Sequence, residues 1–438
     1  MEQKYPKYRF MILLLLLLAL AAQPFNNFGM SALSGPIIEL LNISKAQYGL
    51  LSTLVAFCMG VFAFLGGVVL ANLGIKRCYA LALGIMTIGG LTIGLAALIQ
   101  SYPLMLVCRF VTGIGFGLMY PVKTAVIMKW FPAKERIFLN GFTLAMAYAG
   151  LMVLFQWIYK IYLALGSSVG YTLIVISGIA AFAFVMWMLF YKDTYPGLPG
   201  AEPGSAPAKK EKVRFSFAPV KEVASSKVVR YMTIAAVGHY VAYALVNTFF
   251  PMYFREKFAS IITNPDELAS FANGIAALMP MAGVVAILAA AFLGISVPNR
   301  KLFIWPFQIL FLFGILGSIF SSNVGFVRIC QLIIGVASAA WYPAFTTLPM
   351  ELPSFTPSKV GVSMGFIFGF ANFTQFLMGV IGGKLADAMG TGNMLFILST
   401  IGLVISTIFC LLLPETRGRI IKSEDEFIGS GMNIRVKR

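Results

Sequence analysis

Long apolar segments constrain this chain more than any other feature of its sequence. Apolar runs of about 20 residues recur along the 438-residue chain, and about 20 residues is the length of helix that crosses a bilayer. Hydrophobic residues make up 59% of the chain and charged residues only 11%. A soluble protein of this size cannot bury that much apolar surface. We therefore predict an all-α polytopic membrane protein.

Twelve predicted spans account for these apolar runs. We place them at 11–33, 47–71, 78–100, 103–128, 137–160, 169–191, 230–253, 269–296, 302–321, 325–349, 361–386 and 393–413.

The net charge of +17 indicates membrane topology rather than nucleic-acid binding. Lysine and arginine are concentrated in alternate loops, which is the positive-inside pattern. The basic loops include Lys76–Arg77, Lys129–Arg136 and the segment 192–229. Because the number of spans is even, both termini lie on the side of these basic loops. We expect that side to be the cytoplasm, and the membrane to be a bacterial inner (plasma) membrane.

A basic segment rich in proline and glycine, 192–229, divides the predicted spans into two sets of six. Residues 1–191 form the first predicted six-helix bundle, 230–414 the second, and 415–438 a cytoplasmic tail. We expect 192–229 to be a cytoplasmic linker with a short surface helix near 219–227.

The two halves of the sequence are related. A shift of 222 residues aligns Gly113 with Gly335 and Tyr120 with Tyr342. Two pseudo-symmetric six-helix bundles are typical of secondary transporters, which hold their substrate between the repeats near the membrane midplane.

Two fixed cations, Arg109 and Lys123, lie within the fourth predicted span. On a helix they share one stripe with Gly113 and Tyr120, roughly 21 Å apart along the axis. A charge facing hydrocarbon costs about 2.5–3.5 kcal/mol on insertion scales, so such residues usually face a protein interior or water. The stripe therefore predicts a wet, positively charged path. Two alternatives stay open: Arg109 as a structural cation bonded to backbone carbonyls, and Lys123 snorkelling to the membrane boundary.

Three sequence motifs resemble those of the major facilitator superfamily, and the resemblance covers essentially the whole chain. The pattern Arg109-x-x-x-Gly113-x-Gly115 resembles the fourth-helix motif of that family. GVVLANLGIKR, Gly67–Arg77, resembles its loop between helices 2 and 3, and LPETRGR, Leu413–Arg419, resembles its ending. The resemblance implies the family fold and alternating access by rocking of the two halves. The stretch Tyr120–Arg136 is most similar to branches that carry small organic or inorganic anions.

The resemblance also implies a gating role for the loop between helices 2 and 3. Ala71 and Asn72 stand where the family usually has an acidic residue and an arginine, so the acid of the usual gating salt bridge is missing. The expected gating residues that remain are Gly67, Gly74, Lys76 and Arg77.

Polar side chains in the middle of the spans are candidate substrate ligands, although polar bonds between helices are common and weaken each assignment. The candidates are Arg109, Lys123, Tyr120, Asn26, Asn27, Tyr240, Tyr243, Asn247, Gln331, Tyr342, Asn372 and Gln375. His239 is the only histidine, and a histidine changes charge near physiological pH. It is the proton-coupling candidate; the alternative is a packed, hydrogen-bonded residue.

The acidic residues narrow the substrate class. Every Asp and Glu lies in a predicted loop or near a helix end, whereas carriers of cations generally need a carboxylate within the membrane. Buried cations without acids attract anions. We therefore predict a secondary active transporter of a small organic anion, a mono- or dicarboxylate, by proton symport or anion exchange. The alternative is a facilitator or exporter of a neutral or amphipathic molecule, favoured by the aromatic residues and the 22 methionines.

Enzyme signatures do not occur in this sequence. There is no Ser/His/Asp set, metal-ligand spacing or nucleotide-binding loop. We expect no enzymatic activity, no cofactor, no metal and no nucleic-acid partner. The expected partners are the anion, protons or a counter-anion, and the lipid bilayer, with the chain as a monomer; a non-transporting receptor is a further alternative.

Overall fold

The computed structural model describes residues 6–193, 195–196, 218–293, 300–352, 355 and 357–415. Twelve helical segments in this part of the chain are long and apolar enough to cross a membrane, which confirms the predicted all-α polytopic fold. Most of the predicted linker and nearly all of the predicted tail lie outside the described residues.

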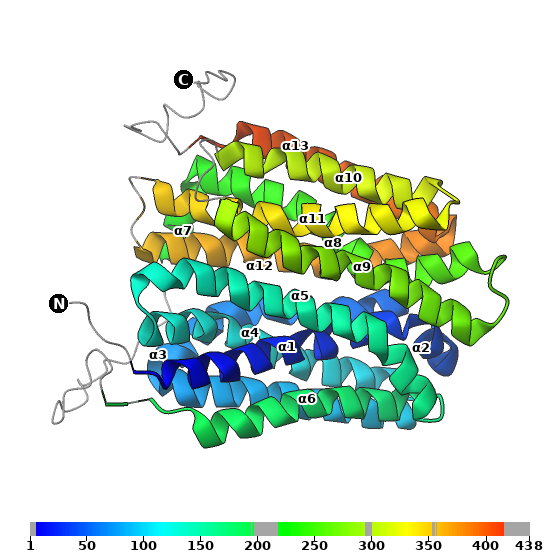
Figure 1. The fold of residues 1–438 in the computed structure, drawn as a ribbon, viewed down its shortest axis with the longest axis horizontal. Helices are drawn as coiled ribbons and strands as arrows, with labels where there is room; N and C mark the ends of the chain where they lie inside the picture. Colours follow the sequence, from blue (N-terminus) through cyan, green and yellow to red (C-terminus); the bar gives the residue numbers. More distant parts are fainter. Residues whose placement is uncertain are drawn as a thin grey trace. The chain divides into compact units, whose positions relative to one another are not determined.

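The described part of the N-terminal half contains six helices (Figure 1). They are α1 Arg9–Ala32, α2 Ser34–Leu41, α3 Lys45–Leu98, α4 Tyr102–Trp130, α5 Ala133–Ala164 and α6 Val169–Phe190. Five of these helices, α1 and α3–α6, supply six candidate membrane spans. The long α3 contributes two of the six, Lys45–Ala63 and Asn72–Leu98. The eight-residue α2 is too short to cross a bilayer.

The C-terminal half contains seven α-helices and two short 3₁₀ helices within its described residues. They are α7 Ala218–Ser225, α8 Lys227–Phe258, α9 Pro265–Leu293, η1 Arg300–Phe303, α10 Trp305–Phe320, α11 Val324–Thr347, η2 Leu348–Glu351, α12 Pro357–Met389 and α13 Thr391–Leu412.

A glycine separates the two spans of α3. Gly74 has φ 78° and ψ 174°, inside what is otherwise a continuous run of helical residues. This backbone conformation is almost exclusive to glycine, because a Cβ would clash there. The chain therefore changes direction at Gly74, between the second and third spans.

Side-chain caps begin several of the spans. Ser101 Oγ accepts a hydrogen bond from the Leu104 amide at 3.4 Å, and Pro103 follows in the first turn of α4. Asn323 Oδ1 accepts from the Phe326 amide at 3.0 Å and begins α11 in the same way. These residues satisfy amides that have no partner within the helix, and so fix where α4 and α11 start.

The chain forms two compact units. The first comprises Met1–Ile43 with Leu51–Phe215, and the second comprises Ser44–Leu50 with Ser216–Arg438. In the first unit α1 packs against α5 and α6. In the second, α8 packs against α12 and α13, and α11 packs against α9 and α10.

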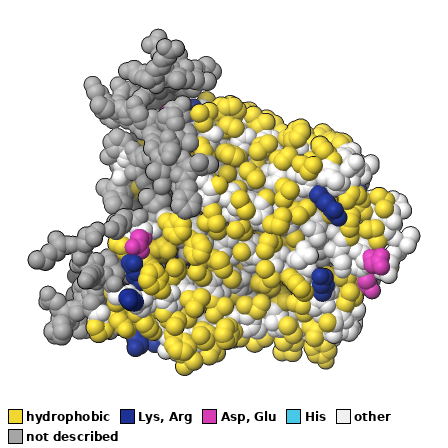
Figure 2. All heavy atoms as spheres, in the orientation of Figure 1, with side chains coloured by type: hydrophobic (Ala, Val, Ile, Leu, Met, Phe, Trp, Pro, Cys, Tyr) yellow, Lys and Arg dark blue, Asp and Glu magenta, His cyan; other side chains and the backbone are white. Residues whose placement is uncertain are grey.

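Each unit has its own apolar core. In the first unit Tyr79, Trp130 and Trp187 are completely buried, and in the second Trp341 and Phe345 are buried to at least 99%. The surface is also apolar: Figure 2 shows hydrophobic side chains over most of the described face, with charged side chains near the helix ends. Such a surface is suited to contact with lipid rather than water.

Candidate functional site

Arg109 is held inside the first unit by backbone carbonyls. Its Nε donates to Leu51 O at 3.1 Å and its Nη1 to Asn26 O at 2.6 Å. Its Nη2 donates to Asn27 O at 3.1 Å and to Ser52 O at 2.7 Å. The residue is only 1% exposed. One guanidinium therefore connects α4 to both α1 and α3.

This arrangement agrees with the alternative that the sequence left open, in which Arg109 is a structural cation bonded to backbone carbonyls. Four of the five N–H donors of a guanidinium are occupied by these carbonyls. A carbonyl is neutral, so it satisfies a donor without cancelling the positive charge. Arg109 thus contributes a buried charge to the first unit while its hydrogen bonds hold the helices together.

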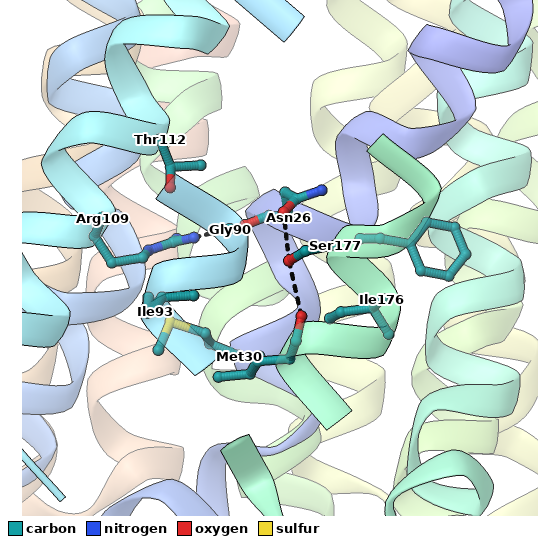
Figure 3. A pocket seen from close by; sticks show the side chains of 10 residues that line it. Asn26, Met30, Gly90, Ile93, Arg109, Thr112, Ile176 and Ser177 are labelled. Atoms are coloured by element: carbon teal, nitrogen blue, oxygen red, sulfur yellow. Dashed lines mark hydrogen bonds between the residues drawn. The ribbon is translucent and has the colours of Figure 1, made fainter. Parts of the chain in front are cut away.

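A small cavity lies beside Arg109 (Figure 3). Asn26 and Ser177 lie next to one another in its lining, and Ser177 Oγ donates to Asn26 Oδ1 at 3.0 Å. The cavity has room for about one water molecule, which is too little for an organic acid. Its lining residues are Phe25, Asn26, Met30, Gly90, Ile93, Arg109, Thr112, Leu173, Ile176 and Ser177.

Lys123 is the second cation predicted on the α4 stripe. It lies roughly 21 Å from Arg109 along the helix axis, and it is partly exposed whereas Arg109 is not. The ion pairs among the described residues are those of Arg9, Lys45 and Lys129, and Lys123 takes part in none of them. The side chain of Tyr120, predicted between the two cations, lies outside the described set.

The glycines of α4 are close-packing positions. A Cβ on Gly113 would lie 2.5 Å from Cβ of Cys58, and one on Gly117 would lie 2.6 Å from Cβ of Phe62. A Cβ on Gly115 would lie 2.6 Å from a carbonyl oxygen of α3. These distances leave no room for a side chain, so the glycines allow α3 and α4 to approach closely, as glycines do between membrane helices.

The second unit brings several predicted residues into one group, which we call the aromatic cluster. The ring centroids of Tyr240 and Tyr243 are 5.6 Å apart, and Tyr240 lies 6.2 Å and Tyr342 5.5 Å from Phe368. Phe368 was not predicted, because a phenylalanine in an apolar span carries no separate signal. The cluster consists of His239, Tyr240 and Tyr243 on α8, Trp341 and Tyr342 on α11, and Phe368 on α12.

His239 and Trp341 are the buried members of the aromatic cluster, each at 1% exposure. The ring centroid of His239 is 4.2 Å from that of Trp341, and its Nδ1 lies 2.8 Å from Gln308 Oε1 on α10. Ser406 Oγ on α13 lies 3.2 Å from the same Oε1 and 2.8 Å from Ala235 O. Gln308 and Ser406 were not predicted as site residues, although a polar residue in an apolar span is a detectable signal.

Three of the predicted amide side chains in the second unit make hydrogen bonds there. Asn247 and Asn372 each donate to the carbonyl four residues earlier on their own helix, at 2.9 Å and 2.8 Å. Gln331 donates to Ser318 Oγ at 2.9 Å and so joins α11 to α10. Gln375 is 6% exposed. A substrate-binding role for these four residues stays a prediction.

The predicted gating loop surrounds the bend at Gly74. Lys76 is partly buried, and its carbonyl accepts a hydrogen bond from Trp187 Nε1 at 3.2 Å. Arg77 is exposed. The surroundings of Gly67 lie outside the described set, and the gating role of the loop stays a prediction.

Among the described residues there is no group of three or more His, Cys, Asp or Glu side chains that could hold a metal ion.

Comparison with known proteins identifies a family and several relatives. The model of the Major Facilitator Superfamily matches residues 14–355. The probable sulfoacetate transporter SauU of Cupriavidus necator is 26% identical over 188 residues, 43% of each chain. The hexuronate transporter of Escherichia coli K12 is 29% identical over 166 residues, 37% of this chain and 36% of the relative.

A third relative is the lysosomal dipeptide transporter MFSD1 of Danio rerio. It is 27% identical over 164 residues, 35% of this chain and 36% of the relative. The chain therefore spans about two fifths of the length of the curated relatives it matches.

Solved structures with the same fold cover nearly the whole chain. A bacterial homolog of the human lysosomal transporter Spinster, inward-facing and unoccupied, has a TM-score of 0.70 at 15% identity over 99% of this chain and all of that one. The nucleoside transporter NupG has a TM-score of 0.66 at 14% identity over 91% of this chain and 98% of that one.

Proposed function

Because the chain belongs to the Major Facilitator Superfamily, we propose that it is a secondary active transporter of a small organic anion, with one or two carboxylate or sulfonate groups. The family assignment supports a membrane transporter of small molecules rather than an enzyme.

The distribution of charge along the spans carries this proposal. Arg109 lies seven residues after Tyr102 and Lys123 seven residues before Trp130, the two ends of the α4 span. In contrast, the acidic residues inside the candidate spans all lie within two residues of a span end: Glu256, Asp266, Glu267 and Asp387. A membrane interior with fixed cations and no carboxylate attracts anions.

The two cations have different proposed roles. Arg109 is 1% exposed and gives four hydrogen bonds to carbonyls, so we assign it the positioning of α1, α3 and α4 and a long-range attraction of anions. Lys123 is partly exposed, and a lysine ammonium carries three donors on a flexible stem. We therefore assign direct contact with the anion to Lys123.

Two of the relatives support an anionic substrate. Their names state sulfoacetate and hexuronate, and both compounds carry a carboxylate at neutral pH. We propose alternating access for this chain, with proton symport through His239 or exchange against a second anion. We also propose a monomer in a bacterial inner membrane with both termini in the cytoplasm, and a gating role for the loop around Gly74.

The aromatic cluster favours a second candidate function, a carrier for a neutral or amphipathic molecule. Tyr240, Tyr243 and Tyr342 are each partly exposed and lie among further aromatic rings. Such rings bind apolar surfaces and present a hydroxyl at the same time. This function does not require the positive charge of Lys123.

A thermal-shift screen of the purified full chain distinguishes the two functions. The panel contains monocarboxylates, dicarboxylates, sulfonates and their uncharged amides. A ligand that binds only the native state, present at a concentration of about 100 times its Kd, stabilises the native state by about 2.7 kcal/mol. We expect carboxylates or sulfonates, and not their amides, to raise the melting temperature.

Substitutions of single lysines then test which positive charge binds the anion. Lys123→Gln should abolish the shift caused by the anion. Lys160→Gln is the matched control, because Lys160 is an exposed lysine at the end of α5, 4.6 Å from the Trp157 ring centroid, and it should retain the shift. Stabilisation by amides in both variants would support the neutral-substrate function instead.

A further inference from the structure

Gln308 lies at the centre of a buried polar group in the second unit. It is completely buried on α10, between His239 of α8 and Ser406 of α13. Its Oε1 is 2.8 Å from His239 Nδ1 and 3.2 Å from Ser406 Oγ. A buried amide in an apolar interior is costly unless its hydrogen bonds are made, so the orientation of this amide matters.

In the orientation of the structure, the hydrogen-bond donors and acceptors of this polar group are not matched one to one. With Oε1 toward the ring, His239 must donate from Nδ1, because an amide oxygen only accepts. Gln308 Nε2 then has no hydrogen-bond partner among the described residues. The hydroxyl of Ser406 has one hydrogen but faces two acceptors, Ala235 O at 2.8 Å and Gln308 Oε1 at 3.2 Å.

A half-turn of the Gln308 amide reverses this pattern. Nε2 then takes the place of Oε1, with one hydrogen directed to His239 Nδ1 and the other to Ser406 Oγ. Ser406 is free to give its single hydrogen to Ala235 O. Nδ1 now has to accept, so the ring hydrogen sits on Nε2. Both orientations fit the same three side chains, and they differ in which ring nitrogen carries the hydrogen.

We propose that the Gln308 amide is a two-position switch that turns with the protonation of His239. Neutral His239 accepts at Nδ1 from Gln308 Nε2. Proton uptake at Nδ1 turns that nitrogen into a donor, and the amide turns to present Oε1, the orientation in the structure. Gln308 is thus a positioning residue that lets the buried ring gain and lose a proton without leaving its place.

Among the described contacts of His239, Gln308 is the side chain placed to respond to protonation of Nδ1. The rings around it belong to Tyr240 and Tyr243 of α8, Phe311 of α10 and Trp341 of α11. From α13 come Ser406 and, 4.0 Å beyond its hydroxyl, the Cys410 thiol. Among these described contacts the titratable groups are two phenols and one thiol, and no carboxylate or cation faces the ring.

The single histidine of the chain makes the test direct. Full-length protein labelled with ¹⁵N-histidine, purified through an affinity tag that contains no histidine, gives one pair of imidazole nitrogen signals. We expect Nε2 to carry the hydrogen at alkaline pH and Nδ1 to be unprotonated but hydrogen-bonded. On acidification Nδ1 should gain the proton. A hydrogen on Nδ1 throughout the alkaline range would overturn the proposal, because the amide would then keep one orientation.

A variant tests the amide itself. Gln308→Met keeps the length of the side chain and removes its hydrogen bonds, so the unprotonated Nδ1 signal should move to the position of a nitrogen without a hydrogen bond. An unchanged Nδ1 signal in Gln308→Met would also overturn the proposal. The wild-type result decides by itself if the variant does not fold.

A role of the Gln308 switch in coupling proton movement to transport rests on the proposed function, and transport assays test it. In proteoliposomes Gln308→Met should lose uptake driven by a pH gradient and retain exchange of anion for anion. If His239→Gln retains uptake driven by a pH gradient, the proton-symport form of the proposed function fails, whereas the nitrogen assignments still decide whether the amide turns.

Discussion

Replacing Arg109 by lysine separates its charge from its hydrogen bonds. Arg109 offers three nitrogens to four carbonyls on α1 and α3, whereas a lysine ammonium has three hydrogens on one atom. At least one bond is lost by count, and a second is lost because one atom cannot face carbonyls of two helices equally well. Hydrogen bonds to charged groups contribute about 1.5–3 kcal/mol each, so Arg109→Lys should destabilise the first unit by roughly 2–6 kcal/mol.

Melting of the purified protein, followed by intrinsic fluorescence, measures this loss. A change of 1 kcal/mol shifts the melting temperature of a unit of about 200 residues by roughly 2–4 °C, so we expect Arg109→Lys to melt at least about 4 °C lower. Arg77→Lys is the matched control, because Arg77 is exposed in the same unit, and it should melt like the wild type.

The same variant tests the division of roles between the two cations. Because Arg109→Lys retains the positive charge, its anion affinity should fall less than that of Lys123→Gln. An unchanged melting temperature together with complete loss of anion binding would refute this reasoning, since Arg109 would then contact the substrate directly.

Three further substitutions test the packing of the fold by melting temperature. Gly74→Ala places a Cβ at φ 78° and should cost about 1–3 kcal/mol, whereas Gly178→Ala, with nothing within 4 Å of the new Cβ, should be neutral. Gly335→Ala puts a Cβ 2.0 Å from a carbonyl of α9 and should cost at least about 1–3 kcal/mol, whereas Gly274→Ala meets nothing within 4 Å. Glu135→Gln breaks a 3.2 Å ion pair whose side chains are 19% and 33% exposed, and should change stability by under about 1 kcal/mol.

Hydropathy predicted the twelve spans because each must match the thickness of the bilayer. It did not predict α2, Ser34–Leu41, which follows α1 after a single residue, Leu33, with φ −106°. The apolar pattern continues through this break, so composition cannot locate it. Some helices also extend beyond their predicted spans: α8 begins at Lys227 rather than 230, because the helix continues past the apolar layer into charged residues.

The charged residues of the candidate site could be predicted from the sequence, whereas most of their contacts could not. The sequence predicts that Arg109 is a fixed cation and keeps a structural role for it open, but its acceptors are carbonyls of Asn26, Asn27, Leu51 and Ser52. Every residue has a carbonyl, so no residue type marks such a partner. The aromatic cluster could be predicted in part, because tyrosines are distinctive within apolar spans.

The most direct test of an anionic substrate compares an acid with its own amide in transport. Proteoliposomes containing the full chain are supplied with the carboxylate or sulfonate found in the thermal-shift screen, or with the amide of the same compound. We predict uptake of the acid at least about tenfold faster than that of the amide, a difference of about 1.4 kcal/mol, and loss of this preference in Lys123→Gln. Equal uptake of acid and amide, in the wild type and in the variant, would contradict the account.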